Sequence, residues 1–317
     1  MNIVSTLHLK EDKKHVLRER FPHDKIEHVK DLSELTASQL ENIEILLTYG
    51  NNLSDELIHK MKKLRWIHSG QSGVEKLPHR LLLEKEIVVT NSKGINAVAM
   101  AEYVMGMILT VEKNIHWFFK AQKSFQWDTI TRQTELARKT MVILGTGEVG
   151  SAIAKRAKAF DMSVIGINRQ GKERVFFDKV YAFQHVQMII GKGDYIVLAM
   201  PLTEKTMYMV DRNFLNRLKN SAILINIGRG ALIKTDELIK VLEEKRIRMA
   251  ILDVFEQEPL EIESKLWKMD NVIITPHIAG DRIKEYSNRM LDIVCDNLSK
   301  YPYFDEMKNI VDLKEGY

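Results

Sequence analysis

Three side chains that can bind an anion or move a proton each follow a strongly apolar run in the second half of the chain. Arg229 follows the run AILIN, Glu258 follows MAILD, and His277 follows NVIIT. Ligands bind at the carboxyl ends of the strands in an open α/β sheet, so we expect the three side chains to be neighbours. A guanidinium can grip a carboxylate through two parallel hydrogen bonds, and an imidazole exchanges protons near neutral pH. The set indicates acid–base chemistry on a small carboxylic acid, although each residue alone also suits an ordinary turn.

A glycine motif earlier in the chain predicts a nucleotide. It runs as GTGEVG from Gly145 to Gly150, between the apolar run MVIL and the helix-like stretch SAIAKRAKAF. Gly145 permits a tight turn, Gly147 lets the backbone approach a pyrophosphate, and Gly150 lets the helix pack on the strand. The N–H groups at the start of that helix, at Glu148 and Val149, would face the phosphates. The motif predicts dinucleotide binding, and the competing interpretation is a tight turn that binds nothing.

The end of the next apolar run, SVIGI, indicates which dinucleotide is bound. A Rossmann unit usually has an acid there that holds the ribose hydroxyls. Here Asn168, Arg169 and Gln170 take its place. An arginine binds a phosphate through its planar fork. NADP(H) is therefore favoured over NAD(H), the alternative being a surface arginine on an ordinary loop.

These residues need a parallel sheet to bring them together, and the sequence from Met141 onward predicts one. MVIL, SVIGI, YIVLA, AILIN, MAILD and NVIIT are near-continuous apolar runs with helix-compatible stretches between most of them. This is the pattern of a doubly wound parallel sheet buried on both faces. Earlier in the chain, strands are expected at Ile43–Leu47 and Ile87–Thr90. Ala97–Leu109 is expected to be a buried helix that joins two domains, and a helix from about Lys284 to Lys300 is expected to cross back to the first.

Composition limits the class of protein. At 317 residues the chain suits two domains, and 45% hydrophobic with 28% charged residues is a globular composition. A net charge of +4 without a dense basic block argues against nucleic acid as a partner. No apolar run is long enough to cross a bilayer, so no membrane partner is expected. Cys295 is the only cysteine, which excludes an internal disulfide and favours the cytoplasm. The histidines show no metal-ligand spacing, so no metal is expected.

Taken together, the motifs NIGRG, DVFEQEP and TPHIAG behind GTGEVG resemble the D-isomer-specific 2-hydroxyacid dehydrogenase family. These NAD(P)-dependent enzymes include glyoxylate/hydroxypyruvate reductases and phosphoglycerate dehydrogenases. The turn from Pro201 to Thr206 resembles the family's cofactor-site turn. Trp66–Val74 resembles its substrate loop, and Thr90–Glu102 resembles its interdomain crossing. The resemblance covers essentially the whole chain.

The resemblance implies a role for each site residue. His277 would protonate the keto oxygen as a hydride reaches the carbon, and Glu258 would hydrogen-bond the other ring nitrogen. Arg229 would bind the substrate carboxylate, and backbone N–H groups around Ser72 and Gly73 would hold its other oxygen. The cofactor would be held by Gly145, Gly147, Glu148, Val149, Gly150, Asn168, Arg169, Gln170, Pro201, Thr206, Ile227, Gly228, Asp253 and Gly280. For Asp253, a helix-capping role after its strand is the alternative.

The resemblance also implies an architecture. A Rossmann cofactor domain would occupy residues 98–282. A smaller, discontinuous flavodoxin-like α/β substrate domain would comprise residues 1–97 and 283–317. The aromatic stretch from Trp117 to Trp127 would help to form a homodimer, and its alternative interpretation is buried core.

The expected function is hydride transfer between a nicotinamide cofactor and a small 2-keto or D-2-hydroxy acid. One alternative on the same fold is a nucleotide-sensing corepressor, which the lack of an extra interaction segment disfavours. Another is a dehydrogenase for formate or phosphite, whose members usually pair the histidine with glutamine where this chain has Glu258. Which 2-keto acid is used, and in which direction, stays open.

Overall fold

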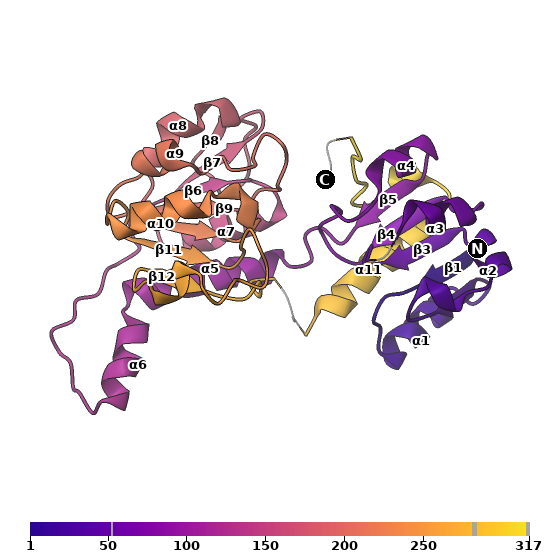
Figure 1. The fold of residues 1–317 in the computed structure, drawn as a ribbon, viewed down its shortest axis with the longest axis horizontal. Coiled ribbons are helices and arrows are strands. Elements are labelled where there is room, and N and C mark those ends of the chain that lie inside the picture. The colour runs from indigo at the N-terminus through magenta and orange to yellow at the C-terminus, as the bar shows by residue number, and fades with distance from the viewer. Residues whose placement is uncertain (52, 281–283, 315–317) are drawn as a thin grey trace. The chain divides into compact units, whose positions relative to one another are not determined.

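The computed structural model describes residues 1–51, 53–280 and 284–314 (Figure 1). The chain divides into two compact units. The smaller unit comprises Met1–Ile95 and Ile283–Tyr317, and the larger unit comprises Asn96–Arg282. The domain boundary predicted at residues 282 and 283 lies outside the described residues. No helix in the described parts of the chain is long and apolar enough to cross a membrane.

The larger unit is built on a seven-stranded sheet with the order β12-β11-β10-β9-β6-β7-β8, in which every pair is parallel. Its strands contain the six apolar runs of the sequence, and four of these strands are buried along all or nearly all of their length. The strands are β6 (Thr140–Leu144), β7 (Ser163–Asn168), β8 (Lys179–Ala182), β9 (Tyr195–Leu198), β10 (Ile223–Asn226), β11 (Met249–Leu252) and β12 (Val272–Ile274).

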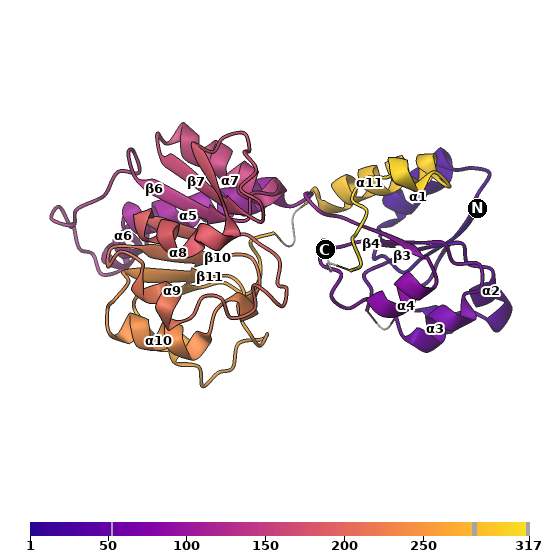
Figure 2. The same ribbon diagram turned by 90° about the horizontal axis from the view of Figure 1, so that it is seen from above.

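Helices cover both faces of this sheet (Figure 2). Alternate strand residues point to opposite faces, so Ile143 packs with α5 and α7 while Leu144 packs with α8, α9 and α10. The helices of the larger unit are α5 (Ala97–Glu112), α6 (Ile115–Lys123), α7 (Glu148–Ala159), α8 (Val186–Ile189), α9 (Arg212–Asn216) and α10 (Thr235–Glu243). Short 3₁₀ helices are η2 (Phe183–His185), η3 (Ile190–Lys192), η4 (Gly230–Leu232) and η5 (Lys265–Lys268). The predicted doubly wound Rossmann sheet is confirmed.

The smaller unit has a five-stranded parallel sheet with the order β2-β1-β3-β4-β5. This is the flavodoxin-like order, so the predicted fold class is confirmed for this unit as well. Its strands are β1 (Asn2–Ser5), β2 (Lys25–His28), β3 (Ile45–Thr48), β4 (Trp66–Ser69) and β5 (Val88–Asn91). Its helices are α1 (Glu11–Arg20), α2 (Ala37–Glu41), α3 (Asp55–Lys60), α4 (His79–Glu84) and α11 (Tyr286–Lys300), with 3₁₀ helices η1 (Leu32–Glu34) and η6 (Phe304–Glu306). Helices α1 and α11 contribute to one core, and α2, α3 and α4 contribute to the other.

Candidate active site

A tight turn after β10 presents Arg229. The buried side chain of Asn226 closes this turn, because its amide donates to the Arg229 carbonyl (3.0 Å) and its oxygen accepts the Gly228 N–H (3.1 Å). The Arg229 side chain is partly exposed, and its Nη1 donates to the Gly228 carbonyl at 2.9 Å. Ile227, which lies within this turn, is buried. The turn therefore fixes where the guanidinium leaves the backbone.

Close packing joins the Arg229 turn to the segment that follows β11. A Cβ atom on Gly230 would lie only 1.8 Å from the carbonyl carbon of Phe255, so only glycine fits there. The Phe255 N–H donates to Oε1 of Glu258 (2.9 Å), and Oε2 of Glu258 lies 2.8 Å from Nδ1 of His277. The structure thus brings Glu258 and His277 into direct contact. Arg229 lies in a turn packed against the backbone that orients Glu258.

The His277 loop is built around the buried carboxylate of Asp253. Its Oδ1 accepts from the Ile278 N–H (2.9 Å) and from the Thr275 hydroxyl (2.6 Å), and its Oδ2 accepts from the Ala279 N–H (2.9 Å). The Asp253 carbonyl also accepts the His277 N–H at 2.8 Å. These bonds hold His277 at φ +52°, a backbone conformation that side chains other than glycine rarely adopt. Asp253 therefore positions the histidine loop in this structure.

Tyr103 on α5 supports the same loop from a distant part of the sequence. Its hydroxyl lies 2.6 Å from the Thr275 hydroxyl, which in turn bonds to Asp253. Burial, together with the nearby Asp253 carboxylate, raises the pKa of Tyr103 to about 12 even though its bond to Thr275 acts the other way. The hydroxyl is therefore protonated at neutral pH and can donate. The sequence analysis missed both Tyr103 and Thr275, because only their contact in the fold reveals them.

Two glycines of the motif are required by close backbone packing, and the third, Gly147, faces open space. Gly145 has φ +103°, and a Cβ there would lie 2.3 Å from the Ala199 carbonyl oxygen. A Cβ on Gly150 would lie 1.9 Å from the Gly145 carbonyl oxygen, so α7 could not approach β6 so closely. A Cβ on Gly147 would meet no atom within 4 Å. Gly147 thus leaves an open approach to the start of α7, at Glu148, and this fits a dinucleotide pyrophosphate.

Asn168, at the end of β7, organises the loop that was predicted to read the ribose. Its Oδ1 accepts the N–H groups of Gln170, Gly171 and Lys172 at 2.7–3.2 Å. Its Nδ2 donates to the Thr146 hydroxyl (2.9 Å) and to the Lys172 carbonyl (2.8 Å). Asn168 therefore shapes the loop, while Arg169 and Gln170 are the exposed predicted residues beside it.

The remaining predicted cofactor residues lie in turns of the same unit. After β9, Thr206 closes a turn by donating its hydroxyl to the Pro201 carbonyl at 2.9 Å. Gly228 lies against the carbonyl oxygen of Met200, which a Cβ would approach to 2.8 Å. Gly280 lies beside Asn96, and a Cβ there would be 3.1 Å from Cβ of Asn96.

Ser72 and Gly73 belong to the smaller unit, in the loop after β4. Asn91 donates its amide to the Ser72 carbonyl (2.8 Å), and the Ser72 hydroxyl donates to the Ser92 carbonyl (3.3 Å). Gln71 ties the loop to β3 by donating to the Tyr49 carbonyl at 2.9 Å. Among the residues that the structure describes, the backbone N–H groups of Ser72 and Gly73 have no acceptor. Two adjacent unpaired N–H groups suit a carboxylate oxygen.

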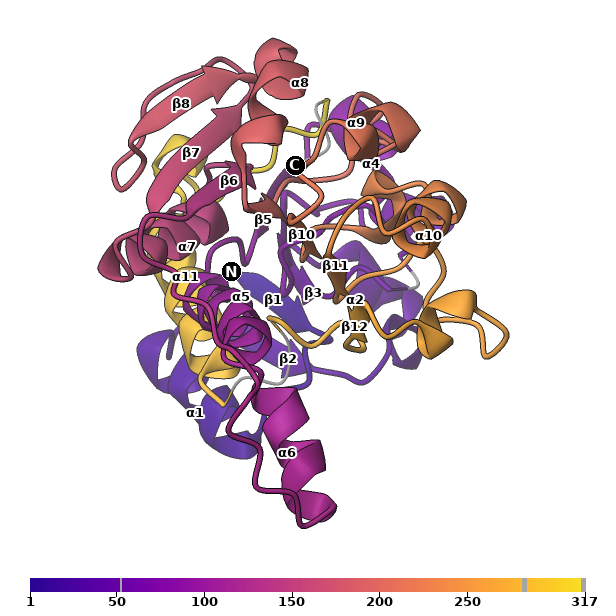
Figure 3. The same ribbon diagram turned by 90° about the vertical axis from the view of Figure 1, so that its left-hand side faces the viewer.

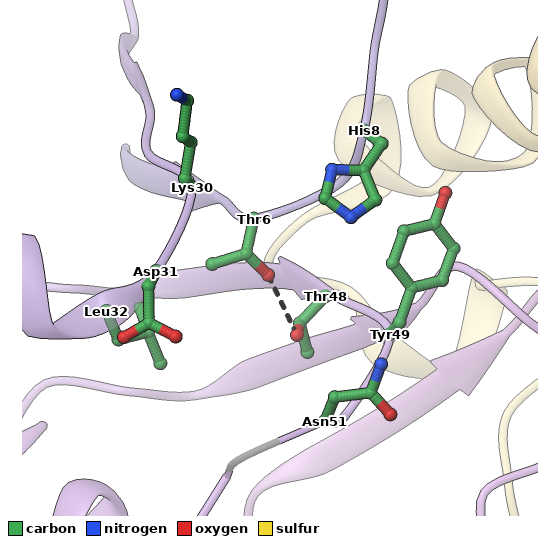
Figure 4. Close-up of a pocket in the computed structure, with 8 residues that line it drawn as sticks. All are labelled: Thr6, His8, Lys30, Asp31, Leu32, Thr48, Tyr49 and Asn51. Carbon is green, nitrogen blue, oxygen red and sulfur yellow. Dashed lines mark hydrogen bonds between the residues drawn. The ribbon is translucent and has the colours of Figure 1, made fainter.

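The smaller unit also has a polar cavity of about 170 Å³ at the carboxyl ends of β1 and β3 (Figure 4). A hydrogen bond from Thr6 to Thr48 (2.9 Å) crosses its centre. None of the predicted site residues lines it. The lining residues are Thr6, His8, Lys30, Asp31, Leu32, Thr48, Tyr49 and Asn51.

The fold and the glycine loop define the class of protein. A doubly wound parallel sheet with a glycine turn between its first strand and first helix is the architecture of dinucleotide-binding proteins. A carboxylate–histidine pair at the carboxyl edge of that sheet has the geometry to move a proton. Among the described residues, no group of three potential ligands is arranged to hold a metal.

Comparison with known proteins identifies the family. Residues 105–279 match the family model described as D-isomer specific 2-hydroxyacid dehydrogenase, NAD binding domain. The chain is 35% identical over 248 residues to glyoxylate/hydroxypyruvate reductase A of Arabidopsis thaliana, which covers 78% of each chain. A solved structure of a D-isomer specific 2-hydroxyacid dehydrogenase family protein from Aeromonas salmonicida has a TM-score of 0.85 and 30% identity. That alignment covers 98% of this chain and 99% of the other.

The chain belongs to the D-isomer specific 2-hydroxyacid dehydrogenase family, a family of NAD(P)-dependent oxidoreductases. The predicted family and enzyme class are therefore confirmed. The chain is also 32% identical over 271 residues to D-3-phosphoglycerate dehydrogenase of Methanocaldococcus jannaschii. That match covers 85% of this chain but about half, 51%, of the longer relative.

Proposed function

We propose that the protein reduces a small 2-keto acid to the D-2-hydroxy acid with a nicotinamide cofactor, NADP(H) in preference to NAD(H). The observation that carries the proposal is the Glu258–His277 pair, 2.8 Å apart, beside the turn that presents Arg229. The relative from Arabidopsis thaliana, named a glyoxylate/hydroxypyruvate reductase, supports a short 2-keto acid as substrate.

Each residue has a role in the proposed reaction. The reduced nicotinamide, when bound, supplies a hydride to the keto carbon. His277 donates a proton from Nε2 to the keto oxygen, because Glu258 engages Nδ1 and thereby fixes which nitrogen faces the substrate. Arg229 binds the carboxylate, and the unpaired N–H groups of Ser72 and Gly73 are assigned to its other oxygen. In the oxidative direction His277 accepts the proton back.

The experiment assays a panel of 2-keto acids with NADPH and NADH, following absorbance of the reduced nicotinamide. We expect His277→Ala to lower kcat roughly 10²–10⁴-fold while cofactor affinity stays within error. Arg229→Lys keeps the charge but loses the planar fork, so kcat/KM should fall for every substrate. Unchanged turnover in His277→Ala would remove the proposed acid. Cofactor binding without turnover of any 2-keto acid in the wild type would favour a nucleotide sensor instead.

The cofactor preference is a separate part of the proposal. The end of β7 carries no carboxylate to repel a 2′-phosphate, and Arg169 and Lys172 are exposed on the loop that Asn168 holds. A charge-assisted hydrogen bond contributes roughly 1.5–3 kcal/mol, which corresponds to about a 10- to 150-fold preference, less the part lost to solvent screening. We expect Arg169→Ala to lower kcat/KM for NADPH and leave that for NADH unchanged. If Arg169→Ala does not reduce the preference, Lys172 and Arg174 on the same loop are the next candidates. Equal use of both cofactors by the wild type would contradict the preference.

A second copy of this chain is the proposed partner. Helix α6 and the segment after it project from the larger unit as an arm (Figure 3). Large apolar side chains on this arm are almost fully exposed: Phe125 at 99%, Trp127 at 93% and Ile130 at 87%. The predicted alternative, that this stretch is buried core within one chain, is therefore wrong. An apolar surface of this kind is typical of a protein–protein interface. We also place the protein in the cytoplasm, whose reducing conditions suit a chain with one cysteine.

A further inference from the structure

A buried chain of polar side chains lies beneath the loop that carries Ser72 and Gly73. It consists of Trp66 and His68 on β4, Thr90 on β5, and Ser92, all fully buried. Nδ1 of His68 lies 2.9 Å from the Thr90 hydroxyl, and Nε2 lies 3.2 Å from the Ser92 hydroxyl. Both ring nitrogens of a side chain without solvent contact therefore have a partner.

The hydrogen bonds at both ends of this chain determine its direction. Trp66 can only donate, and its Nε1–H points to the Thr90 oxygen at 2.9 Å. The Ser92 hydroxyl donates its proton to the Ser69 carbonyl at 3.2 Å, so it must accept from His68. His68 therefore carries its proton on Nε2, and Nδ1 accepts from the Thr90 hydroxyl. The Trp66 indole, the Thr90 hydroxyl, the His68 ring and the Ser92 hydroxyl thus each donate one hydrogen bond, and the last is accepted by the Ser69 carbonyl.

This arrangement holds His68 neutral. A second ring proton, on Nδ1, would clash with the Thr90 hydroxyl proton. None of the four side chains in this row is a carboxylate, so none of them compensates for a buried positive charge. Burial accordingly lowers the pKa of His68 to about 3. The neutral ring thus keeps one donor and one acceptor throughout the pH range in which enzymes are assayed.

The end of the chain, at Ser92, holds the loop at three points. The Ser92 hydroxyl bonds to Ser69, the Ser92 N–H donates to the Gln71 carbonyl (3.2 Å), and the Ser92 carbonyl accepts the Ser72 hydroxyl (3.3 Å). Rotating or shifting Ser92 would therefore turn the peptide units of the loop. Those units carry the unpaired N–H groups of Ser72 and Gly73.

We propose that His68 is a positioning residue, which fixes Ser92 and through it the direction of the carboxylate-binding N–H groups of Ser72 and Gly73. The assignment of these N–H groups to the substrate rests on the proposed function. The orientation of the loop by His68 rests on the hydrogen bonds of the smaller unit alone. A histidine suits the position because its two ring nitrogens span from Thr90 to Ser92 while its rigid ring fills the core.

The test compares His68→Phe, which keeps the ring and loses both hydrogen bonds, with His68→Gln, whose amide retains an acceptor and a donor. For His68→Phe we expect KM for 2-keto acids to rise about 10-fold, the effect of one lost buried hydrogen bond. The value of kcat should change less, and the cofactor Kd should not change. His68→Gln should return KM to within about 3-fold of the wild type. Ser5→Ala, which alters a different buried polar side chain in this sheet, is the matched control and should leave KM unchanged.

Hydrogen–deuterium exchange of the peptide covering residues 69–76 gives a second readout that does not depend on activity. Faster exchange in His68→Phe and recovery in His68→Gln would support positioning, even if the wild type turned over no 2-keto acid and the proposed function failed. Lower thermal stability with unchanged exchange and unchanged KM would show a purely structural role and overturn the proposal. An equal loss of kcat, substrate affinity and cofactor affinity would also overturn it, because that result indicates general damage.

Discussion

His277 and His68 show how their surroundings assign different roles to one residue type. The His277 side chain is 51% exposed, and its Nδ1 contacts the Glu258 carboxylate. Its other ring nitrogen, Nε2, is therefore left for a substrate. His68 has no exposure, and both its ring nitrogens lie against uncharged hydroxyl groups. In the proposed reaction the first exchanges a proton, whereas the surroundings of the second keep its ring neutral.

The buried histidine makes stability depend on pH. A histidine in the unfolded chain has a pKa near 6.5, whereas burial lowers the pKa of His68 to about 3. Between these values the unfolded chain binds a proton that the folded chain does not, so the free energy of unfolding falls as the pH falls. One such group contributes a slope of about 1.4 kcal/mol per pH unit. Burial and the nearby Lys14 and Arg18 lower the pKa of His28 to about 4. His28 therefore adds to the loss of stability as the pH falls from about 6.5 to about 4.

Denaturant unfolding from about pH 7.5 to about pH 4.5 measures this dependence. The wild type should lose stability steadily below about pH 6.5. His68→Phe should be less stable at neutral pH because its hydrogen bonds are gone, yet its slope should be shallower by up to one proton. A variant with the wild-type slope would show that His68 does not titrate as described.

The contact between Glu258 and His277 could be predicted from the sequence, but the hydrogen bonds that support it could not. Arg229, Glu258 and His277 stand out because each follows an apolar strand that ends at the same edge of the sheet. Tyr103 and Thr275 are 172 residues apart, and nothing in the local pattern of either one indicates their hydrogen bond. The same holds for His68, whose partners lie on the next strand.

At the scale of elements, apolar runs predicted the strands of the larger unit well, because those strands are buried on both faces. Four strands were missed: β1 (NIVS), β2 (KIEH), β4 (WIHS) and β8 (KVYA). Strands β2 and β8 are partly exposed and need no continuous apolar run. Strands β1 and β4 are more buried, but each has only two consecutive apolar residues, which is too short a run to indicate a strand. The two strands predicted in the smaller unit begin and end one or two residues later in the structure. Their last residues, Thr48 and Asn91, are polar but buried, because the sheet continues past the apolar run.

The two later glycines of the β6–α7 turn allow fold and cofactor binding to be separated. Gly147→Ala adds a methyl group where no protein atom lies within 4 Å, so thermal stability should not fall. Cofactor affinity should fall at least about 10-fold, because the methyl group occupies the approach to the pyrophosphate. Gly150→Ala places its Cβ 1.9 Å from the Gly145 carbonyl and should cost about 2 kcal/mol or more in stability.

Thermal unfolding and cofactor titration, followed by nicotinamide fluorescence, check both variants. An unstable Gly147→Ala, or one that binds cofactor normally, would contradict the role given to the open glycine. The pair is informative because the two changes are chemically identical and lie three residues apart.

At the scale of the whole molecule, the exposed arm predicts the state of assembly. Phe125→Ser and Trp127→Ser remove apolar side chains that are 99% and 93% exposed in the described part of the chain, so the fold should be retained. The wild type should sediment as a dimer. The double variant should still be monomeric at concentrations at least about 10-fold above those at which the wild type forms dimers. Trp267→Ser, which changes an exposed tryptophan outside the arm, is the control and should leave the dimer intact. A wild type that sediments as a monomer would contradict the proposal that the arm binds a second copy of this chain.

The hydrogen bonds of Asn168 limit which residue types the end of β7 can accept. The Asn168 amide donates to the Lys172 carbonyl at 2.8 Å while its oxygen accepts three backbone N–H groups. Replacing Asn168 by aspartate, a residue type that commonly holds a ribose at this place, would set a carboxylate oxygen against that carbonyl. An acid at this position therefore requires a different conformation of the loop. Asn168→Asp would thus keep an acceptor for the three N–H groups but cost the loop its amide donor.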